Sequence, residues 1–320
     1  MTDDRVAALV IFGASGFVGG HVRRAAPAWA RDVLLVTRRS TDPAPHERVI
    51  HGDLREPSSF APALPKGSVV VNLAFDAHAP ADVNLAMADG LAAAGAACAA
   101  SRVVHLSTAT VVGPCPDRWI SEDTPCRPAT PYQRTKLAIE ARLRERASGT
   151  FPLVVLRPTA VFGENGLNLK KLTNDLRTRP RIESYVRACL YGRRAMNLVP
   201  VETVTAAVRF AATSPRAIDD GLYQVAADEA PENNFADVER IVRRGLGFRD
   251  RRVEPIRLPL AALTAVLEAS GRYSLNPAAR FSSDRLRHAG FTPPVTFADA
   301  LERYAAAAHD TASKGDPASA

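Results

Sequence analysis

The sequence has few of the residues on which several common protein classes depend. Only four of its 320 residues are cysteine, with neither CxxC spacing nor a histidine cluster nearby: Cys98, Cys115, Cys126 and Cys189. This scarcity argues against a zinc site or a disulfide framework, so we expect no bound metal and a location in the reducing cytoplasm. No apolar stretch is long enough to span a bilayer, so we expect no membrane insertion.

Aromatic residues are also scarce, at 6% of the chain, and the arginines are scattered. Although the net charge is +7, no stacking surface interleaved with basic residues is evident, so we do not expect nucleic-acid binding. A basic balance suits an enzyme whose ligands carry phosphates. Residues 1–4 are largely acidic, and the first apolar run passes directly into glycines, so we expect no cleaved signal peptide.

What the chain does have is a regular alternation of strand and helix patterns. Apolar runs rich in branched residues predict buried strands at 5–12, 32–37, 68–74, 102–108 and 151–158. A helix is predicted at 16–29, after the first strand, and alanine-rich segments predict helices at 83–100 and 131–146. Such alternation requires crossover connections and hence a parallel sheet with helices on both faces. We therefore predict an α/β fold with a doubly wound, Rossmann-type sheet.

The alternation weakens beyond Phe162, which predicts a second, smaller lobe. We expect residues 1–165 to form a dinucleotide-binding domain to which 196–226 return. Residues 166–195 and 227–308 would form a substrate-binding lobe. The last segment, 309–320, lacks apolar periodicity and is expected to be disordered.

A glycine-rich turn follows the first predicted strand. The run GASGFVG places Gly13, Gly16 and Gly19 between an apolar strand and an amphipathic helix. Small residues there let the backbone approach a pyrophosphate, and the helix N-terminus supplies free N–H groups and a positive dipole end. This context favours a dinucleotide site over an ordinary tight turn.

The end of the second predicted strand bears on the choice of cofactor. An acidic side chain there would bind the ribose hydroxyls of NAD, but the sequence has Thr37, Arg38 and Arg39. Two guanidinium groups suit the 2′-phosphate of NADP, so we favour NADP(H) over NAD(H). The alternative is that the arginines lie on a solvated rim. Asp53, in HGDL, would accept a hydrogen bond from the adenine amine or merely cap a turn.

The main catalytic pattern is Tyr132 with Lys136 in PYQRTK. Four residues are about one helical turn, so the phenol and the ammonium share a face, and we expect the cation to lower the pKa of the phenol. Taken alone the pair would be surface packing. Ser107 and Thr108, however, end a strand upstream, where a hydroxyl can face the same cavity. Thr108 would orient a substrate carbonyl, Tyr132 would transfer the proton, and Lys136 would tune Tyr132 and hold the nicotinamide ribose.

Taken together, these residues resemble the extended short-chain dehydrogenase/reductase family, also called the NAD-dependent epimerase/dehydratase family. The resemblance rests on motifs in the family's order: GASGFVG, HGDL, VVNLA, HLSTATVVG, PYQRTK, LRPTAVFG, NLVPVETV, GLYQVA and FSSDRLRHAGFTPPVTFADAL. It implies a cofactor loop made of Gly13, Ser15, Gly16, Phe17 and Val18.

Further roles follow from the same resemblance. It implies adenine contacts at Asp53 and Leu54, and residues flanking the cofactor ribose at Leu73 and Ala74. Ser107 and Thr108 match the family's strand-end hydroxyls, of which Thr108 is the catalytic one. Pro158 matches a residue that packs near the nicotinamide.

Departures from the family pattern reduce the number of reactions that we expect this chain to catalyse. The 4,6-dehydratases have a threonine-aspartate-glutamate run where this chain has Thr108, Ala109 and Thr110, so an acid/base pair for eliminating water is absent. NAD-retaining epimerases have an acidic residue where this chain has Thr37–Arg39. Reduction of a keto group by NADPH is the activity that remains most natural.

The chain most resembles reductases and epimerases that act on UDP-linked keto sugars in bacterial surface polysaccharide pathways. The segments LRPTAVFGENGLN and GFTPPVTFADAL carry this likeness, and Asn168 matches an asparagine that faces the substrate. The arginine that precedes the NLVPV-like strand is replaced by Met196, with Arg193 and Arg194 upstream as candidate substrate residues.

Four hypotheses remain open at this point. The favoured one is an NADPH-dependent keto reductase of a nucleotide sugar. The others are an epimerase with retained NAD, a reductase of a lipid, steroid or polyketide carbonyl, and a protein that senses NADP without catalysis. The family also predicts a homodimer through the helices at 83–100 and 131–146, whose alanines would equally suit internal packing.

Overall fold

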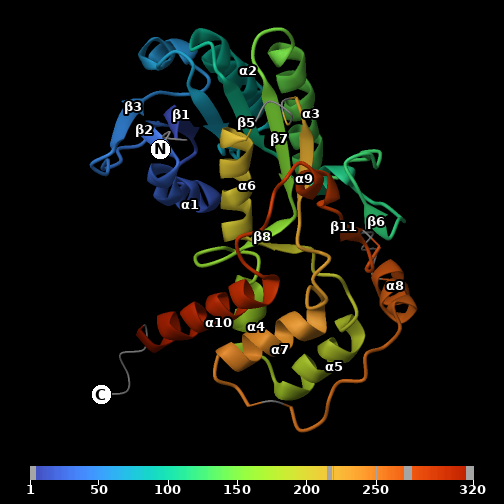
Figure 1. The fold of residues 1–320 in the computed structure, drawn as a ribbon. Helices are drawn as coiled ribbons and strands as arrows, with labels where there is room; N and C mark the ends of the chain where they lie inside the picture. Colours follow the sequence, from blue (N-terminus) through green and yellow to red (C-terminus); the bar gives the residue numbers. More distant parts are fainter. Residues whose placement is uncertain (1–4, 215–217, 219, 250, 270–275, 315–320) are drawn as a thin grey trace.

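Seven parallel strands form the central sheet of the computed structural model, which describes residues 5–214, 218, 220–249, 251–269 and 276–314 (Figure 1). Their order across the sheet is β3-β2-β1-β4-β5-β7-β10. Their bounds are β1 Val6–Phe12, β2 Ala30–Thr37, β3 Glu47–His51, β4 Val69–Asn72, β5 Arg102–Leu106, β7 Leu153–Pro158 and β10 Leu222–Val225. The predicted doubly wound α/β fold is confirmed.

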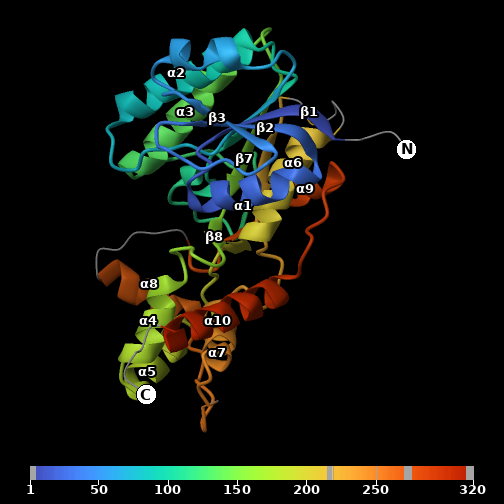
Figure 2. The same cartoon turned by 90° about the vertical axis from the view of Figure 1, so that its left-hand side faces the viewer.

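Helices cover both faces of this sheet (Figures 1 and 2). One face carries α1 (Phe17–Ala25), α6 (Val201–Thr213) and the short α9 (Asp284–His288), and the other carries α2 (Ala81–Ala97) and α3 (Pro131–Ala147). Successive side chains of a strand point to opposite faces. In β1, Leu9 and Ile11 therefore pack toward α1 and α6, whereas Val10 and Phe12 pack toward α2 and α3. A strand covered on both sides is apolar throughout, which is the pattern that predicted it.

Several element boundaries differ from the sequence prediction by a few residues, and two of these differences have a clear local cause. Helix α1 ends at Ala25 rather than Trp29, because Pro27 lacks the N–H group that would continue the helix, and a 3-10 turn over Ala26–Ala28 follows. Strand β5 ends at Leu106, two residues early. The hydroxyl of Thr108 accepts the N–H of Thr110 and caps a 3-10 turn, which pulls the chain out of the ladder.

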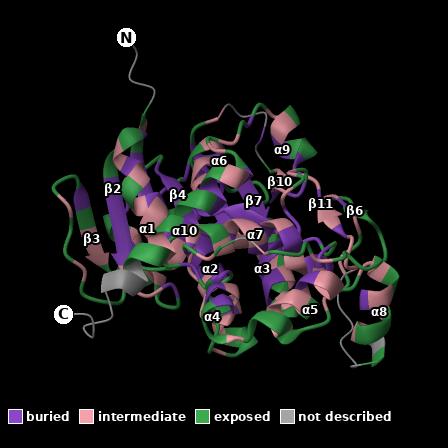
Figure 3. Cartoon of the chain, turned by 90° about the horizontal axis from the view of Figure 1, so that it is seen from below, coloured by how far each residue is buried: buried purple, intermediate pink, exposed green. Residues whose placement is uncertain are grey.

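A second, helical lobe lies beyond the carboxyl ends of the strands (Figure 1). It contains α4 (Lys170–Thr178), α5 (Arg181–Tyr191), α7 (Phe235–Gly245), α8 (Leu260–Ala269) and α10 (Phe297–Lys314). Its core is formed by side chains that include Phe162, Val238, Val242, Phe297 and Leu301. Seen from below, buried residues of α7 lie between more exposed helices (Figure 3). Short parallel pairs complete the fold: β8 (Ala160–Phe162) with β9 (Leu198–Pro200), and β6 (Trp119–Ile120) with β11 (Arg280–Phe281).

Near the C-terminus, the chain departs from the predicted division. The whole of 227–308 was expected in the lobe, yet α9 packs on the sheet, where Leu286 and Phe291 join the core beside α6. The disordered tail was expected from residue 309, but α10 continues to Lys314 because no glycine or proline interrupts it before position 315. Residues 1–4 and 315–320, also subjects of prediction, lie outside the described residues. No helix in the described ranges is long and apolar enough to cross a membrane.

Candidate active site

A cavity of about 430 Å³ opens at the carboxyl ends of β1, β2, β3 and β4. In doubly wound sheets, ligands bind at this edge, where the strand order reverses. Ten of the sixteen residues predicted to bind cofactor line the cavity: Gly13, Ser15, Gly16, Thr37, Arg38, Arg39, Asp53, Leu54, Leu73 and Ala74. The topology brings them together because each group follows the end of a neighbouring strand.

The three glycines of the first turn differ in how much space surrounds them. Gly13 has a positive φ of 79°, and a Cβ there would lie 2.6 Å from the Ala74 nitrogen. A Cβ at Gly19 would lie 2.0 Å from the Gly13 carbonyl oxygen. At Gly16 a Cβ would meet nothing closer than 3.4 Å, and φ is an ordinary −74°. The protein's own packing therefore demands glycine at positions 13 and 19, but not at 16.

Gly16 also caps α1 without any side-chain hydrogen bond to the helix N-terminus. The first N–H groups of a helix have no partner within the helix and favour an anion. Open space above Gly16 and these donors fit the pyrophosphate of a dinucleotide. The residues present thus fit the cofactor that the sequence predicts.

The far rim of the cavity is basic. Arg38 and Arg39 are exposed there, and the Thr37 hydroxyl accepts the N–H of Arg39 at 3.1 Å. Arg38 lies 4.0 Å from Asp53, which is bound more closely by the guanidinium and N–H of Arg55. These hydrogen bonds lower the pKa of the Asp53 carboxyl. Asp53 therefore caps its own turn as an anion while lining the cavity, and its contact with adenine stays a prediction.

Helix α3 presents Tyr132 and Lys136 from its first two turns. Thr130 caps the helix by accepting the N–H of Gln133 at 3.2 Å, and the Gln133 side chain accepts the N–H of Thr130 at 3.1 Å. Pro131 fits the first helical position because the N–H that it lacks would have no partner. The local sequence TPYQ thus fixes where the helix begins and hence the direction of Tyr132.

Phe75 lines the cavity and also contacts helix α3. Its ring packs edge-on against Tyr132, with centroids 5.3 Å apart, and the Lys136 ammonium lies 4.5 Å from its centroid. Sequence reasoning missed Phe75. Its position directly after VVNLA, at the end of a strand that borders the cavity, was the available signal.

Lys136 is only 5% exposed, and its ammonium donates to the Leu106 carbonyl oxygen at 3.1 Å. Burial lowers its pKa to about 8, and the negative charge of Glu140 acts in the opposite direction. A buried cation of this kind is typical of a functional site.

The prediction that Lys136 lowers the pKa of Tyr132 is not what the structure shows. Burial raises the pKa of the phenol, and the neighbouring Thr108 hydroxyl offsets this only in part. The reason is that desolvation penalises the phenolate more than the surroundings stabilise it. Tyr132, 43% exposed, is therefore a neutral phenol at pH 7.

The two strand-end hydroxyls have different surroundings. Thr108 lies beside Tyr132 and shares a 3.0 Å hydrogen bond with the Thr110 hydroxyl. Ser107 is buried and donates to Glu140 on α3. The Ser107 hydroxyl is thus engaged in a polar cluster beneath the site.

The remaining predicted residues lie outside the cavity. Phe17 and Val18 begin α1, where Phe17 packs near Gly163 and Gly166, and Pro158 is the buried end of β7. The Asn168 amide donates to the Val161 carbonyl oxygen at 2.7 Å. Arg193 and Arg194 are exposed, and Arg193 donates to the Arg257 carbonyl oxygen. Met196, in place of the family's arginine, packs against the lobe core.

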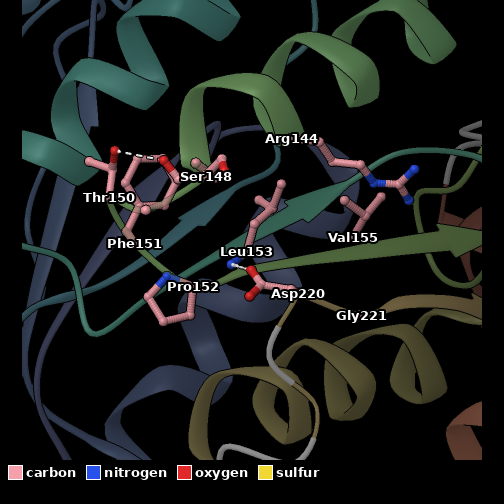
Figure 4. A pocket seen from close by; sticks show the side chains of 11 residues that line it. Arg144, Ser148, Thr150, Phe151, Pro152, Leu153, Val155, Asp220 and Gly221 are labelled. Atoms are coloured by element: carbon pink, nitrogen blue, oxygen red, sulfur yellow. Dashed lines mark hydrogen bonds between the residues drawn. The ribbon is translucent and has the colours of Figure 1, made fainter.

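A larger cavity of about 570 Å³ lies at the opposite, amino edge of the sheet, between the end of α3 and the starts of β7 and β10 (Figure 4). Its charged side chains are Arg144 and Asp220, and one Asp220 oxygen already accepts the N–H of Leu153. It contains none of the predicted site residues. Among the described residues, no cluster of histidine, cysteine, aspartate or glutamate is placed to hold a metal ion.

Comparison with known proteins adds three kinds of finding. A family model, NAD dependent epimerase/dehydratase family, matches residues 9–226. A curated relative, 2'-dehydrokanamycin reductase of Streptomyces kanamyceticus, is 31% identical over 160 residues, or 48% of this chain. The match spans 43% of that relative's length, less than half of it.

Solved structures resemble the chain over almost its whole length. The WbmG enzyme of Bordetella bronchiseptica, in complex with NAD, has a TM-score of 0.72 at 19% identity and covers 96% of this chain and 94% of its own. The dTDP-glucose 4,6-dehydratase DesIV of Streptomyces venezuelae, with NAD bound, has a TM-score of 0.69 at 20% identity, covering 97% and 99%. At this identity the likeness concerns the fold.

Proposed function

Because the chain belongs to the NAD dependent epimerase/dehydratase family of oxidoreductases, we propose that it uses NADP(H) to reduce a keto group of a nucleotide-linked (UDP) sugar. The observation that carries the proposal is Phe75, which lines the cavity and contacts both Tyr132 and Lys136. Through this contact Tyr132 and Lys136 lie beside the residues of the cavity, where they would serve as proton donor and cation.

The cofactor cavity supports the choice of NADP(H). When bound, the nicotinamide would supply the hydride. Gly16 and the N-terminus of α1 would hold the pyrophosphate, and Arg38 and Arg39 the 2′-phosphate. The rim contains no acidic side chain at positions 37–39 that would repel this phosphate.

The proton would come from Tyr132. A reduced carbonyl needs a proton on its oxygen, and a phenol with a raised pKa is in the donating form at pH 7. Thr108, beside the phenol, would orient the carbonyl oxygen. The Lys136 ammonium would stabilise the phenolate left behind. Solvent then returns the proton to Tyr132, which is partly exposed.

Two features support reduction over the family's other reactions. Ala109 and Thr110 are found where dehydratases have carboxylates, so elimination of water lacks its acid/base pair. The curated relative is itself named a reductase. A protein isolated with tightly held, non-exchanging NAD would instead indicate an epimerase.

A second candidate is a reductase of a carbonyl that carries no nucleotide, such as a lipid, steroid or polyketide ketone. It is supported by Met196, which packs into the lobe core where an arginine would contact a diphosphate. Arg193 and Arg194, both exposed, would have to supply that contact for a UDP sugar.

Replacing Tyr132 with Phe tests the proposed chemistry. We expect Tyr132→Phe to bind NADPH as wild type does and to lose at least about 100-fold in kcat, since only the proton donor is removed. NADPH oxidation with a panel of keto sugars and hydrophobic ketones gives the activity, and fluorescence titration gives the cofactor affinity. Turnover retained by the variant would show that Tyr132 is not the donor, and a wild type inactive on every ketone would favour a non-catalytic NADP sensor.

The setting of the enzyme is also proposed. We place it in the cytoplasm, supported by four free cysteines, which suit a reducing compartment. We further propose a homodimer through α2 and α3, supported by exposed alanines on both helices, among them Ala93 and Ala141.

A further inference from the structure

Three buried polar side chains form a cluster beneath Lys136. Glu140 is 1% exposed, Arg157 on β7 is 3% exposed in its side chain, and Ser107 follows the end of β5. The Arg157 guanidinium donates to both Glu140 oxygens, at 2.9 Å from Nε and 2.6 Å from Nη2, and the Ser107 hydroxyl donates to Glu140. The Glu140 cluster, as we call these three residues, thus ties α3 to the ends of two strands.

We propose that Glu140 is a positioning residue that keeps Lys136 in its ammonium form and fixes its helix against β5 and β7. This inference rests on the proposed function, in which the Lys136 ammonium serves Tyr132. Glu140 follows Lys136 by one helical turn, so both side chains project from the same face of α3. The Glu140 carboxylate accepts from Arg157 and Ser107, whereas the Lys136 ammonium donates to the Leu106 carbonyl oxygen.

The groups around Lys136 show why the Glu140 charge matters. His105 on β5 is fully buried, and desolvation holds its pKa well below 6.5, so its ring is neutral and contributes no charge. Its Nδ1 shares a hydrogen bond with the Asn72 amide. Tyr132 is neutral and the ring of Phe75 is uncharged. Glu140 is the group whose charge raises the pKa of Lys136 against the effect of burial.

Loss of the Glu140 charge would therefore release the Lys136 proton at lower pH. With a pKa of about 8, wild-type Lys136 is mostly an ammonium ion at pH 7. A neutral amine cannot stabilise a phenolate on Tyr132. The Arg157 charge cannot replace the anion, because it has the wrong sign.

Direct titration of Lys136 tests the inference without cofactor or turnover. The chain has only five lysines, of which Lys66, Lys170 and Lys171 are exposed, so ¹³C-labelled lysine signals in NMR spectra can be assigned. We expect Glu140→Gln to titrate Lys136 about one pH unit or more below wild type. Glu140→Asp should restore part of the difference. Glu145→Gln, an exposed carboxyl on the same helix, is the matched control and should titrate as wild type.

Glu140→Gln leaves the buried Arg157 charge without its partner, and this variant could unfold. The double variant Glu140→Gln, Arg157→Met removes both charges and should still titrate Lys136 below wild type. An unchanged Lys136 titration in the double variant, once folding is confirmed by circular dichroism, would overturn the proposal.

The pH profile of kcat/KM supplies a second readout. Above pH 8, a pKa lower by one unit reduces the ammonium fraction about tenfold. We expect the alkaline limb of the profile to move to lower pH in Glu140→Gln by the same amount as the NMR titration, whereas a purely structural role would lower the whole profile equally. If Tyr132→Phe stays active, the proposed function fails, but the lysine titration still decides what the Glu140 charge does.

Discussion

Lys136 is a cation held where water cannot solvate it, and only 5% of its surface is exposed. Its hydrogen bond to the Leu106 carbonyl oxygen replaces few of those that an ammonium makes in water. The active site therefore costs the protein stability. Such a cost is common where function requires a charge in a low-dielectric place.

That cost predicts how stability depends on pH. The folded-state pKa, about 8, is below the unfolded value of 10.5, so the unfolded chain binds more protons between these values and the free energy of unfolding rises with pH across them. Below pH 8 the full cost is present, about 3 kcal/mol. Lys136→Met should therefore be more stable than wild type at pH 7 by up to that amount. Urea unfolding at pH 7 and pH 10 measures this, and a difference that does not shrink at pH 10 would contradict it.

Arg38 and Arg39 decide the choice between cofactors in our proposal. Each guanidinium would make charge-assisted hydrogen bonds to the 2′-phosphate, so replacing both with Ala should weaken NADPH binding about 10- to 100-fold and leave NADH binding unchanged. Fluorescence titration with both nucleotides measures the ratio. Arg48→Ala, an exposed arginine on β3 outside the cavity, serves as the charge control. Equal loss for both nucleotides would contradict a contact with the 2′-phosphate, and no loss for either would place the arginines on a solvated rim.

At the residue scale, the site residues that lie within sequence motifs could be predicted from the sequence. The residues that support them through contacts between separate elements could not. Gly13 and Arg38 directly follow strand ends and Asp53 lies two residues beyond one, so parallel topology alone brings them to one edge. Phe75 and Glu140 act through packing across separate elements. Nothing in the local sequence around Glu140 indicates a partner on β7, because that contact depends on the register between α3 and the sheet.

At the scale of elements, the turn between β1 and α1 contains glycines with two different roles. Gly19 is needed for packing, and Gly16 leaves space for the proposed cofactor. Gly19→Ala should destabilise the protein by about 3 kcal/mol, because its Cβ would overlap the Gly13 carbonyl oxygen at 2.0 Å. Gly16→Ala should cost at most about 1 kcal/mol, the usual difference at a helix N-cap, yet reduce cofactor affinity at least about tenfold. Thermal unfolding and nucleotide titration of both variants compare the two effects. Unchanged cofactor binding by Gly16→Ala would argue against a pyrophosphate at this turn.

Helices and strands could be predicted where their burial produces a recognisable pattern of apolar residues in the sequence. A strand covered on both faces is largely apolar, so β1, which is apolar throughout, was evident from its residues. Helix α9 was not predicted, since only Leu286 of its five residues is buried and no periodicity can be seen over one turn. The early end of β5 depends on a single hydroxyl cap at Thr108, which competes with the strand ladder.

At the scale of the whole molecule, the proposed homodimer is directly measurable. Small exposed side chains on α2 and α3 would let two copies bring these helices together as a four-helix contact. Light scattering coupled to size exclusion should give twice the chain mass of 34.3 kDa. Ala141→Arg should give the single-chain mass, and Ala261→Arg on α8 should not. A wild-type species of 34.3 kDa would count against the dimer.

The return of α9 to the sheet affects how this chain could evolve. Residues 9–226 match the family model, yet Leu286 and Phe291 arrive from well beyond that boundary to cover the same core. A single recombination crossover therefore could not exchange the sheet domain, or the segment beyond residue 226, as an intact unit. In a chimaera that takes its helical lobe from a relative, the exchanged segments would be interrupted by residues that pack on the sheet. More than one junction would be needed, so we expect the sheet domain and the lobe to be inherited together.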